Sequence, residues 1–384
     1  MRILHIISSL NPQFGGTSTA VRVLLDHGPE GYAQEVATLD DPKAPFLRDI
    51  GVPVHALGPT SFTYGLTKKL IPWLEANRSR FDGVVVHGMW QYTGYAVWRT
   101  MRGRVPYMVF THGMLDPYFK HSFRMKHIKK WLYWLPVEYW VLRGAFRVLF
   151  TGETEAELAK ESFWLHRWNA HVVPFGTIPP ASDPDSQKIQ REAFFSVCPA
   201  VREKRFLLFL GRIDRKKGCD LLIDAFVKLA PVDPQLDLVM AGPDSQNWRL
   251  ELEGVGDAGL MARIHWPGML QGEAKWGAFR AAEAFALPSH QENFGIAVAE
   301  AMACAKPVLL SDKVNIAAQI TADGAGLMES DTAAGTERLL TRWIALPIAG
   351  REAMGARALE CFQQRYDMRE NASTIVRLFE KASH

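Results

Sequence analysis

The segment His290-Gln-Glu-Asn-Phe-Gly-Ile-Ala-Val-Ala-Glu300 carries the strongest signal in the sequence. The apolar run Ala284–Leu287 precedes it and predicts a buried strand, whereas the small residues after the Asn-Phe-Gly turn predict a helix from about Ile296. A second apolar run, Pro307–Ser311, comes next. A strand, a helix and a further buried strand in this order predict a βαβ unit with parallel strands.

The same alternation of short apolar runs and longer helical patterns covers the rest of the chain. Near-continuous Val, Ile, Leu and Phe are typical of parallel strands that are covered on both faces. Further strands are predicted at Arg2–Leu10, Val52–Leu57, Gly83–His87, Tyr107–Thr111, Arg147–Phe150, His171–Pro174, Phe206–Leu210, Leu236–Ala241 and Arg263–Trp266. We therefore predict an α/β fold with doubly wound parallel sheets.

The length of 384 residues favours two domains over one. The strand pattern restarts after Pro174–Ser186, which is rich in Pro, Gly, Ser and Asp and is typical of a linker. We predict one Rossmann-like domain over residues 1–173 and a second over residues 187–363. A helical pattern at Met368–Lys381 ends the sequence.

Composition and the N-terminus narrow the class of protein. A net charge of +3 does not suggest a nucleic-acid binder. The four cysteines lack metal-type spacing, so we expect reduced thiols. Met1–Leu10 is apolar but short and runs into Asn11-Pro12, which predicts a strand and not a signal peptide. No run is long enough to span a membrane, so we expect a cytoplasmic protein, soluble or peripheral on the inner face of the cell membrane.

Two carboxylates of the segment His290–Glu300 are candidates for substrate binding. The Asn-Phe-Gly turn leaves free backbone N–H groups at a helix start, which favours a phosphate there. Glu292 would lie in the loop near a sugar, and Glu300 one helical turn inside, where it can accept both hydroxyls of a ribose. The alternative is an amphipathic helix with two solvated glutamates.

A basic loop, Gly211-Arg-Ile-Asp-Arg-Lys-Lys-Gly218, follows another predicted strand. Arg212 as a planar fork and Lys217 as a point charge can reach one diphosphate. Positive charge there would stabilise a leaving nucleoside diphosphate. The alternative is a solvated basic loop.

Two weaker signals lie in the first half. Gly15-Gly16 precedes a helix from about Thr17, and glycines let the backbone approach a pyrophosphate. The pattern is not GxGxxG, so a dinucleotide cofactor is poorly supported. His112, in Thr111–Asp116, follows a predicted strand and can point toward a ligand, although a structural histidine is the alternative.

Together these residues resemble glycosyltransferase family 4, the large retaining family with the GT-B fold. The resemblance spans most of the chain and is most specific over Gly211–Gly218 and His290–Pro307. It implies two domains that face a central cleft, the first binding the acceptor and the second the nucleotide-sugar donor. It also implies that the last helix returns to the first domain, which adds residues 364–384 to that domain.

The resemblance gives the candidates their roles. Glu300 looks like the ribose ligand, Glu292 like the carboxylate facing the donor sugar, and His112 like the histidine that contacts this sugar. The implied catalytic set is His112, Glu292, Arg212 and Lys217. The implied nucleotide-sugar-binding set is Gly15, Gly16, Arg212, Lys217, Asn293, Phe294, Gly295, Ile296 and Glu300.

The resemblance also implies a same-face transfer, in which the acceptor hydroxyl attacks from the side that the diphosphate leaves. No DxD-type metal motif stands out in the sequence. We therefore expect a clamp of Arg212 and Lys217 without a metal and without a cofactor, since the nucleotide diphosphate sugar is a substrate.

The segment 118–143 is rich in lysine and tryptophan. Met125, Ile128, Leu132 and Leu135 fall on one helical stripe, and Lys126, Lys129, Lys130 and Tyr133 fall on the opposite face. A basic face flanked by Trp131, Trp134 and Trp140 suits an anionic membrane interface. The alternative is that the apolar stripe packs on the first domain while the lysines are solvated.

With these features, the resemblance implies a retaining hexosyltransferase that uses a UDP- or GDP-linked sugar. The expected acceptor is a saccharide, lipid-linked or an oligosaccharide, in exopolysaccharide, capsule or lipopolysaccharide assembly, and no nucleic acid is expected. One alternative is a GT-B epimerase or a synthase with a small soluble acceptor. Another is a non-catalytic module that binds glycans or membranes.

Overall fold

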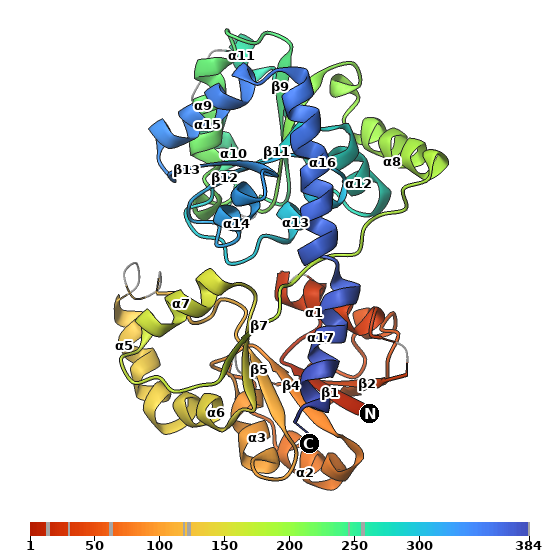
Figure 1. The fold of residues 1–384 in the computed structure, drawn as a ribbon, viewed down its shortest axis with the longest axis vertical. Helices are drawn as coiled ribbons and strands as arrows, with labels where there is room; N and C mark the ends of the chain where they lie inside the picture. The colour runs from red at the N-terminus through yellow and green to blue at the C-terminus, as the bar shows by residue number, and fades with distance from the viewer. Residues whose placement is uncertain are drawn as a thin grey trace. The chain divides into compact units, whose positions relative to one another are not determined.

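A computed structural model describes residues 1–12, 16–29, 31–60, 64–117, 120, 124–244, 246–254 and 258–382 (Figure 1). The chain forms two compact units, one of Met1–Gly176 with Met368–His384 and one of Thr177–Asp367. The predicted linker is divided between them: Pro174–Gly176 belong to the first unit, and the residues from Thr177 onward belong to the second. Thr177 N–H donates to Tyr366 O over 3.1 Å, and Arg280 Nη2 donates to Ala181 O over 2.7 Å.

The first unit is built on a seven-stranded parallel sheet in the order β3-β2-β1-β4-β5-β6-β7. Its strands are β1 Arg2–Ile7, β2 Ala33–Thr38, β3 Val54–Ala56, β4 Gly83–His87, β5 Tyr107–Phe110, β6 Arg147–Phe150 and β7 Ala170–Val172. The six strands predicted here are confirmed. Strand β2 was not predicted, because it carries Gln34 and Glu35. Glu35 is nevertheless buried, since it accepts from Arg80 at 2.9 Å and contacts His55 at 2.6 Å.

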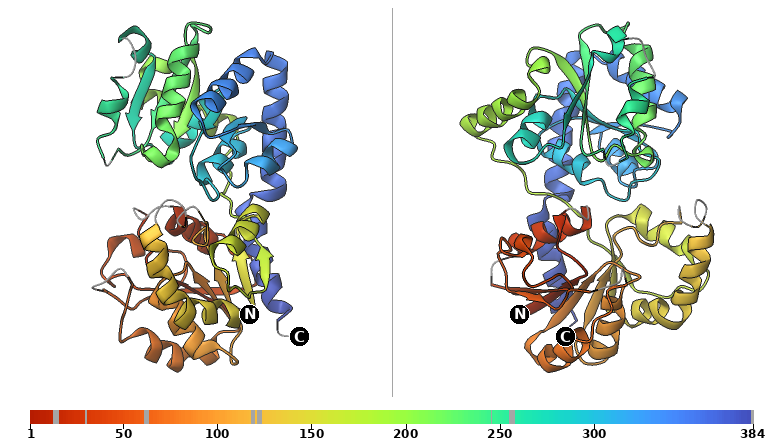
Figure 2. Two further views of the ribbon diagram at one scale, coloured as in Figure 1. Left: turned by 90° about the vertical axis from the view of Figure 1, so that its left-hand side faces the viewer. Right: turned by 180° about the vertical axis from the view of Figure 1, so that it is seen from behind.

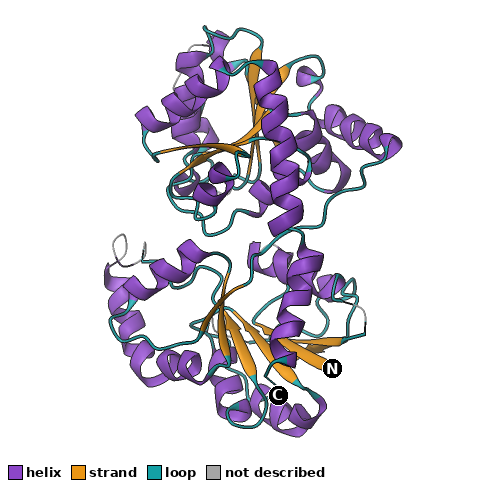
Figure 3. Ribbon diagram, viewed as in Figure 1, coloured by secondary structure: helices purple, strands orange, loops and turns teal. Residues whose placement is uncertain are grey.

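Helices cover both faces of this sheet, as Figure 3 shows. They are α1 Gly16–Asp26, α2 Leu70–Asn77, α3 Tyr92–Met101, α5 Arg124–Tyr133, α6 Tyr139–Gly144, α7 Glu153–Ser162 and α17 Met368–Glu380, with short turns at Pro45–Leu47 and Arg78–Arg80 and a π-helical turn at Trp134–Glu138. Alternate residues of β1 enter different cores: Leu4 and Ile6 join one apolar cluster, and Ile7 joins the other.

The second unit is built on a six-stranded parallel sheet in the order β10-β9-β8-β11-β12-β13. Its strands are β8 Arg205–Leu210, β9 Leu236–Ala241, β10 Ile264–Gly268, β11 Ala284–Leu287, β12 Val308–Ser311 and β13 Gly326–Glu329. Its helices are α8 Pro184–Val197, α9 Cys219–Leu229, α10 Arg249–Leu252, α11 Ala258–Met261, α12 Gly272–Ala281, α13 Ile296–Ala303, α14 Ala317–Ala322, α15 Ala333–Ala345 and α16 Ile348–Arg365, with 3-10 turns at Pro199–Val201 and Arg215–Lys217. The predicted fold class is confirmed, and only β13 was missed in this unit.

The two termini both lie in the first unit (Figure 2). Helix α17 packs against α1 and buries one face of its apolar residues. Phe379 lies over the start of β4, where a Cβ on Gly83 would come within 2.6 Å of its ring. No helix in the described ranges is long and apolar enough to cross a membrane.

We expect Phe379→Ala to lower the free energy of unfolding of the first unit by about 3–5 kcal/mol, because it empties a fully buried ring site. The matched control is Arg377→Ala on the exposed face of the same helix, which should change it by less than about 0.5 kcal/mol. Calorimetric unfolding measures both. Equal transitions for the two variants would show that α17 does not stabilise this unit.

Candidate active site

Two loops of the second unit meet at the carboxyl ends of β8 and β11. Gly218 has φ 66°, and a Cβ there would come within 2.1 Å of Pro288 O, so only glycine allows this approach. His290 N–H donates to Lys216 O over 2.9 Å. The Ser289 hydroxyl donates to the same carbonyl over 2.8 Å. The basic loop Gly211–Gly218 and the start of the segment His290–Glu300 are thus joined by two hydrogen bonds to one backbone carbonyl.

This junction brings together two of the predicted site residues. Lys217 Nζ forms an ion pair with the Glu292 carboxylate, although the two are 75 residues apart in sequence. Both side chains keep less than a fifth of their surface exposed. Arg212, in the same loop, is exposed and makes no ion pair with any described residue. The Lys217–Glu292 ion pair is therefore only partly exposed to solvent. The same loop also carries the guanidinium group of Arg212, which has no ion-pair partner among the described residues.

Glu300 lies on α13 and is mostly buried. Lys275 Nζ, on α12, donates to Glu300 Oε1 over 2.6 Å. Lys275 was not predicted as part of the site, because a pairing over 25 residues between two helices leaves no local pattern in the sequence.

The predicted phosphate cradle forms the start of α13. Gly295 precedes the helix with φ 74°, a conformation that favours glycine. Asn293 Oδ1 accepts from Asn315 Nδ2 over 3.2 Å, and Phe294 packs edge-on against Tyr366 at 5.6 Å. The turn is therefore fixed by its side chains, while the helix start at Ile296 offers backbone N–H groups.

In the first unit, His112 follows β5 with φ 51°, a left-handed conformation that is uncommon for a side-chain-bearing residue. Its ring stacks on Phe110 at 4.7 Å and on Phe175 at 4.9 Å. Its Nε2 lies 3.2 Å from Nδ1 of His87, and Nε2 of His87 lies 3.0 Å from Nδ1 of His5. His5 and His87 were not identified as site residues, because each lies within an apolar predicted strand.

All three histidines are shifted toward the neutral form. Burial lowers the pKa of His5 to about 4, with the Gln34 side chain acting in the opposite direction. Burial lowers the pKa of His112 to about 3. Burial, and then His5 and His112, hold the pKa of His87 well below its usual value. The group is therefore uncharged at neutral pH.

A cavity of about 710 Å³ opens beside His87 in the first unit. Its lining comes from the carboxyl ends of β1, β2 and β4 and the start of α1 and combines apolar surface with polar residues, which include Ser8, Ser9, Thr17, Ser18, Asp40, Asp41, His87 and Gln91. Asp40 is fixed in place by donors from Ser9 at 2.5 Å and Thr38 at 2.7 Å. Gly16 begins α1, whereas Gly15 lies outside the described residues.

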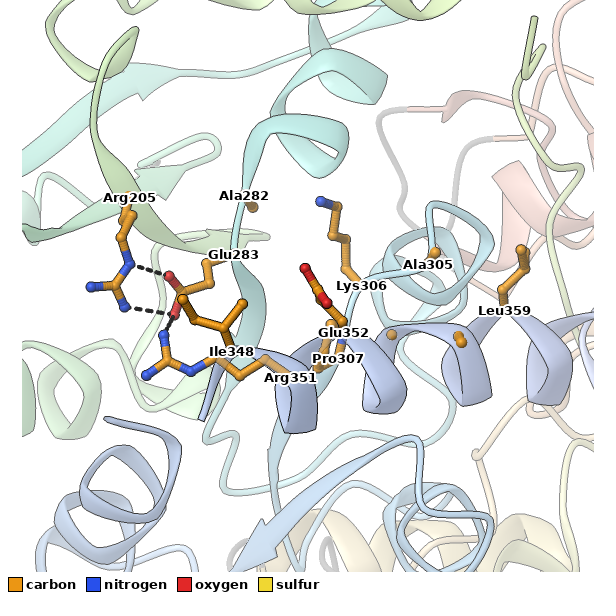
Figure 4. Close-up of a pocket in the computed structure, with 12 residues that line it drawn as sticks. Arg205, Ala282, Glu283, Ala305, Lys306, Pro307, Ile348, Arg351, Glu352 and Leu359 are labelled. Carbon is orange, nitrogen blue, oxygen red and sulfur yellow. Dashed lines mark hydrogen bonds and ion pairs between the residues drawn. The ribbon is translucent and has the colours of Figure 1, made fainter. Parts of the chain in front are cut away.

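A second cavity, of about 880 Å³, lies in the second unit (Figure 4). Arg205 and Arg351 both contact the Glu283 carboxylate there, at 2.5 Å and 2.6 Å. Burial, and then Arg191, lower the pKa of Lys306, which also lines the cavity, to about 8. This cavity is at the amino ends of β8, β11 and β12, so it is separate from the Lys217–Glu292 pair at the carboxyl ends.

Comparison with known sequences shows the family of the chain. Residues 190–360 match the family described as glycosyl transferases group 1, and residues 15–176 match the glycosyl transferase 4-like domain. The chain belongs to these glycosyltransferases. The matches cover both predicted domains and the loops that carry Arg212, Lys217, Glu292 and Glu300.

Named relatives of this glycosyltransferase match it over part of their length. Mannosylfructose-phosphate synthase of Agrobacterium fabrum is 30% identical over 182 residues, which is 44% of this chain and 38% of that protein. The lipopolysaccharide core mannosyltransferase LpsB of Rhizobium meliloti is 32% identical over 193 residues, which is 45% of this chain and 54% of that protein. This chain thus matches only about half, or less, of these relatives' length.

Solved structures show the same GT-B fold. The Anabaena HepE protein in complex with UDP-glucose superposes with a TM-score of 0.74 at 18% identity, covering 99% of this chain and 100% of that one. The chain is therefore a two-domain glycosyltransferase in fold as well as in sequence.

Helix α5 of this glycosyltransferase turns its apolar stripe outward. Met125 is 70% exposed and Leu132 is 76% exposed, and Ile128 and Leu135 are exposed as well. The alternative in which this stripe packs on the first domain is therefore wrong. Trp164, 77% exposed, stacks on Trp131 at 5.9 Å and extends the same surface.

The face predicted to be basic is partly buried instead. Lys130 Nζ lies 4.6 Å from the centre of the Trp90 ring, and burial lowers its pKa to about 8. Tyr133 pairs with the Tyr64 hydroxyl at 2.6 Å. Trp134, expected at the membrane interface, is fully buried and stacks on Phe163, because it belongs to the core of the first unit. Residues 118, 119 and 121–123 of this segment, and the Lys126 side chain, lie outside the described part of the structure.

We expect the stability of the first unit to fall as the pH is lowered from about 6.5 toward 4. The unfolded histidines gain protons below their usual pKa of 6.5, whereas His5, His87 and His112 stay neutral when folded. Burial raises the pKa of Glu138 to about 7, so the folded state binds this one proton before the unfolded state does. Glu138 therefore raises the stability slightly as the pH falls. The net effect is a loss of about 1–3 kcal/mol per pH unit.

Urea unfolding at pH 7, 6 and 5 tests this expectation. His87→Gln should show a shallower dependence on pH, because one of the shifted groups is gone. His27→Gln, which changes an exposed histidine, should keep the slope of the unmodified chain. A slope of zero in the unmodified chain would mean that the three histidines are not held neutral.

Proposed function

We propose that this glycosyltransferase moves a hexose, with retention of configuration, from a UDP- or GDP-linked donor to a saccharide acceptor. The observation that carries the proposal is the Lys217–Glu292 pair beside Arg212, joined to the start of α13 that leads to Glu300. Cations for a diphosphate, N–H groups for its oxygens and a carboxylate for a ribose then follow one another along one edge of the sheet. The HepE complex with UDP-glucose supports a nucleotide-sugar donor.

The second unit would bind the donor by exchanging partners. Lys217 is held by Glu292 in the structure, and an arriving diphosphate competes for the same ammonium group. Glu292, once released, is free to accept a hydrogen bond from a hydroxyl of the donor sugar. Glu300 would accept hydrogen bonds from the ribose hydroxyls through one carboxylate oxygen, while its Oε1 keeps the contact with Lys275.

The chemical step we propose is a same-face displacement. The acceptor hydroxyl attacks C1 of the donor sugar, the bond from C1 to the diphosphate oxygen breaks, and the hydroxyl proton passes to the leaving phosphate. Arg212 and Lys217 neutralise the negative charge that develops on this phosphate. No step uses a metal or a cofactor.

For the acceptor, we propose a lipid-linked saccharide in exopolysaccharide, capsule or lipopolysaccharide assembly. The cavity beside His87 has hydroxyl, carboxylate and amide side chains in its lining and can accommodate a group rich in hydroxyls. The outward stripe of α5, with the exposed Lys129 and Trp164, has the composition of a helix that lies in a membrane interface. The similarity to LpsB supports an acceptor of this class.

A second candidate is a synthase with a small soluble acceptor. The relative mannosylfructose-phosphate synthase favours it, and a cavity of about 710 Å³ suits a small sugar equally well. This candidate predicts turnover in solution that lipid does not increase.

We expect Arg212→Ala and Lys217→Ala to lower kcat by about a hundredfold or more, since each removes charge from the leaving diphosphate. Glu300→Ala should instead weaken binding of the nucleoside diphosphate by about tenfold, because hydrogen bonds to the ribose are lost. Calorimetric binding of UDP, GDP and ADP and a transfer assay, run in EDTA throughout, measure both effects.

Arg215→Ala is the matched control, because Arg215 lies in the same loop but pairs with Glu251 at 2.8 Å. It should keep normal turnover. Normal kcat in Lys217→Ala, or undiminished nucleotide binding in Glu300→Ala, would remove that residue from the proposed site. Loss of all activity in EDTA, restored by Mg²⁺, would contradict a metal-free transfer.

The membrane proposal predicts that the chain co-sediments with vesicles containing phosphatidylglycerol. Leu132→Glu should reduce the bound fraction about tenfold, because it places a charge on the exposed stripe. Leu250→Glu is the control, since Leu250 is equally exposed but lies in the second unit. Equal sedimentation of the two variants, or no binding by the unmodified chain, would favour the soluble acceptor.

A further inference from the structure

Four polar side chains form a continuous line across the sheet of the first unit. They come from four structural neighbours: Gln34 on β2, His5 on β1, His87 on β4 and His112 after β5. In the register of the sheet, Ile3 pairs with Gln34 and Ile7 pairs with His87. Because side chains two residues apart in a strand share a face, the line lies on one face of the sheet.

The number of protons on the three imidazole rings forces the hydrogen bonds along this line to run in one direction. A neutral imidazole has one N–H donor and one bare acceptor nitrogen. His87 uses both of its nitrogens, Nε2 toward His5 and Nδ1 toward His112. It must therefore donate in one contact and accept in the other. The three rings are then all of the same tautomer: either all carry the proton on Nε2, or all carry it on Nδ1.

The buried end of the line decides between these two states. Gln34 Oε1 is buried and has no hydrogen-bond partner within the described part of the chain. An unsatisfied buried carbonyl oxygen is costly, and a histidine N–H is the donor that its neighbour His5 can supply. The Gln34 side chain raises the pKa of His5, as an acceptor beside an imidazole N–H does. His5 then carries its proton on Nε2, and His87 and His112 follow.

We propose that Gln34, His5 and His87 are positioning residues that hold His112 with its proton on Nε2 and its Nδ1 bare. This inference rests on the proposed function only for the role of that bare nitrogen. Nδ1 of His112 makes no hydrogen bond with the described residues, and the ring is partly exposed. It is therefore a fixed acceptor for a hydroxyl of the sugar substrate, and not a proton donor.

The left-handed backbone of His112 fits this role. Such a conformation costs free energy, and persists where the surroundings hold it. Here Phe110 and Phe175 stack on the ring, and Gly113 N–H donates to the buried Glu155 at 2.7 Å. The stacking fixes the plane of the ring, and the contact with His87 fixes which nitrogen is protonated.

The first test is the tautomer itself. Two-bond nitrogen–proton correlation spectra of the full 15N-labelled chain at pH 7 distinguish Nδ1–H from Nε2–H in each ring, and single His→Gln variants assign the signals. We expect His5, His87 and His112 all to carry the proton on Nε2. Protonation on Nδ1 in the three rings would overturn the proposal, whatever the activity of the protein.

The second test uses a matched pair at the buried end. Gln34→Met removes the acceptor, and should shift His112 toward the Nδ1–H form and lower kcat/KM about tenfold while nucleoside diphosphate still binds normally. Gln34→Glu keeps an acceptor and should retain the Nε2–H form and most of the activity. An unchanged His112 tautomer in Gln34→Met would show that Gln34 does not set the direction. If no transfer can be detected with any donor, the proposed function fails, but the tautomer result still decides this inference.

Discussion

The arrangement of the second unit depends on one steric constraint, the approach of Gly218 to the carbonyl oxygen of Pro288. The 2.1 Å gap left for a Cβ means that any other residue would push the two loops apart. With glycine, Lys216 O accepts from both His290 N–H and the Ser289 hydroxyl, which anchors the loops at two further points. Lys217 reaches Glu292 only because of this close packing, so the charge pair is a consequence of backbone geometry.

The two sheets provide the frame for such sites, and most of that frame is readable from the sequence. Strands β4, β6, β9 and β11 begin and end where predicted, because each is a short apolar run between polar turns. Strand β2 was not predicted, because Gln34 and Glu35 interrupt its hydrophobic pattern. The sheet tolerates Glu35 since Arg80 and His55 satisfy it, and both lie far along the chain. Such compensation is a tertiary effect, which no local pattern reports.

The site shows the same division between local and long-range information. Glu292 and Lys217 lie in loops that follow strands, and Glu300 lies on the helix that follows one of these loops. The sequence marks these places by a strand, a turn and a helix in series. Lys275 and the histidines of β1 and β4 are defined by their partners instead. The orientation of α5 is of this kind as well: periodicity places Met125, Ile128 and Leu132 on one face, but only packing of Trp134 and Lys130 decides that this face points outward.

The two units handle charge in opposite ways, and this difference bears on what each can bind. In the second unit, Lys217 and Lys275 are each paired with a glutamate, so neither ammonium group is left without a counter-charge when no ligand is bound. An anionic ligand can replace Glu292 at Lys217 at modest cost, because the pair is reached by solvent and one attraction replaces another.

The first unit has excluded charge from its line of histidines altogether. Burial keeps His5, His87 and His112 neutral, so they can offer only oriented hydrogen bonds. Oriented neutral groups discriminate between the positions of hydroxyls, whereas exchangeable ion pairs attract a diphosphate of any nucleoside. Under the proposed function, selection among sugars would therefore depend more on the geometry of the histidine line than on the charge pairs, which would supply affinity and stabilise the leaving group.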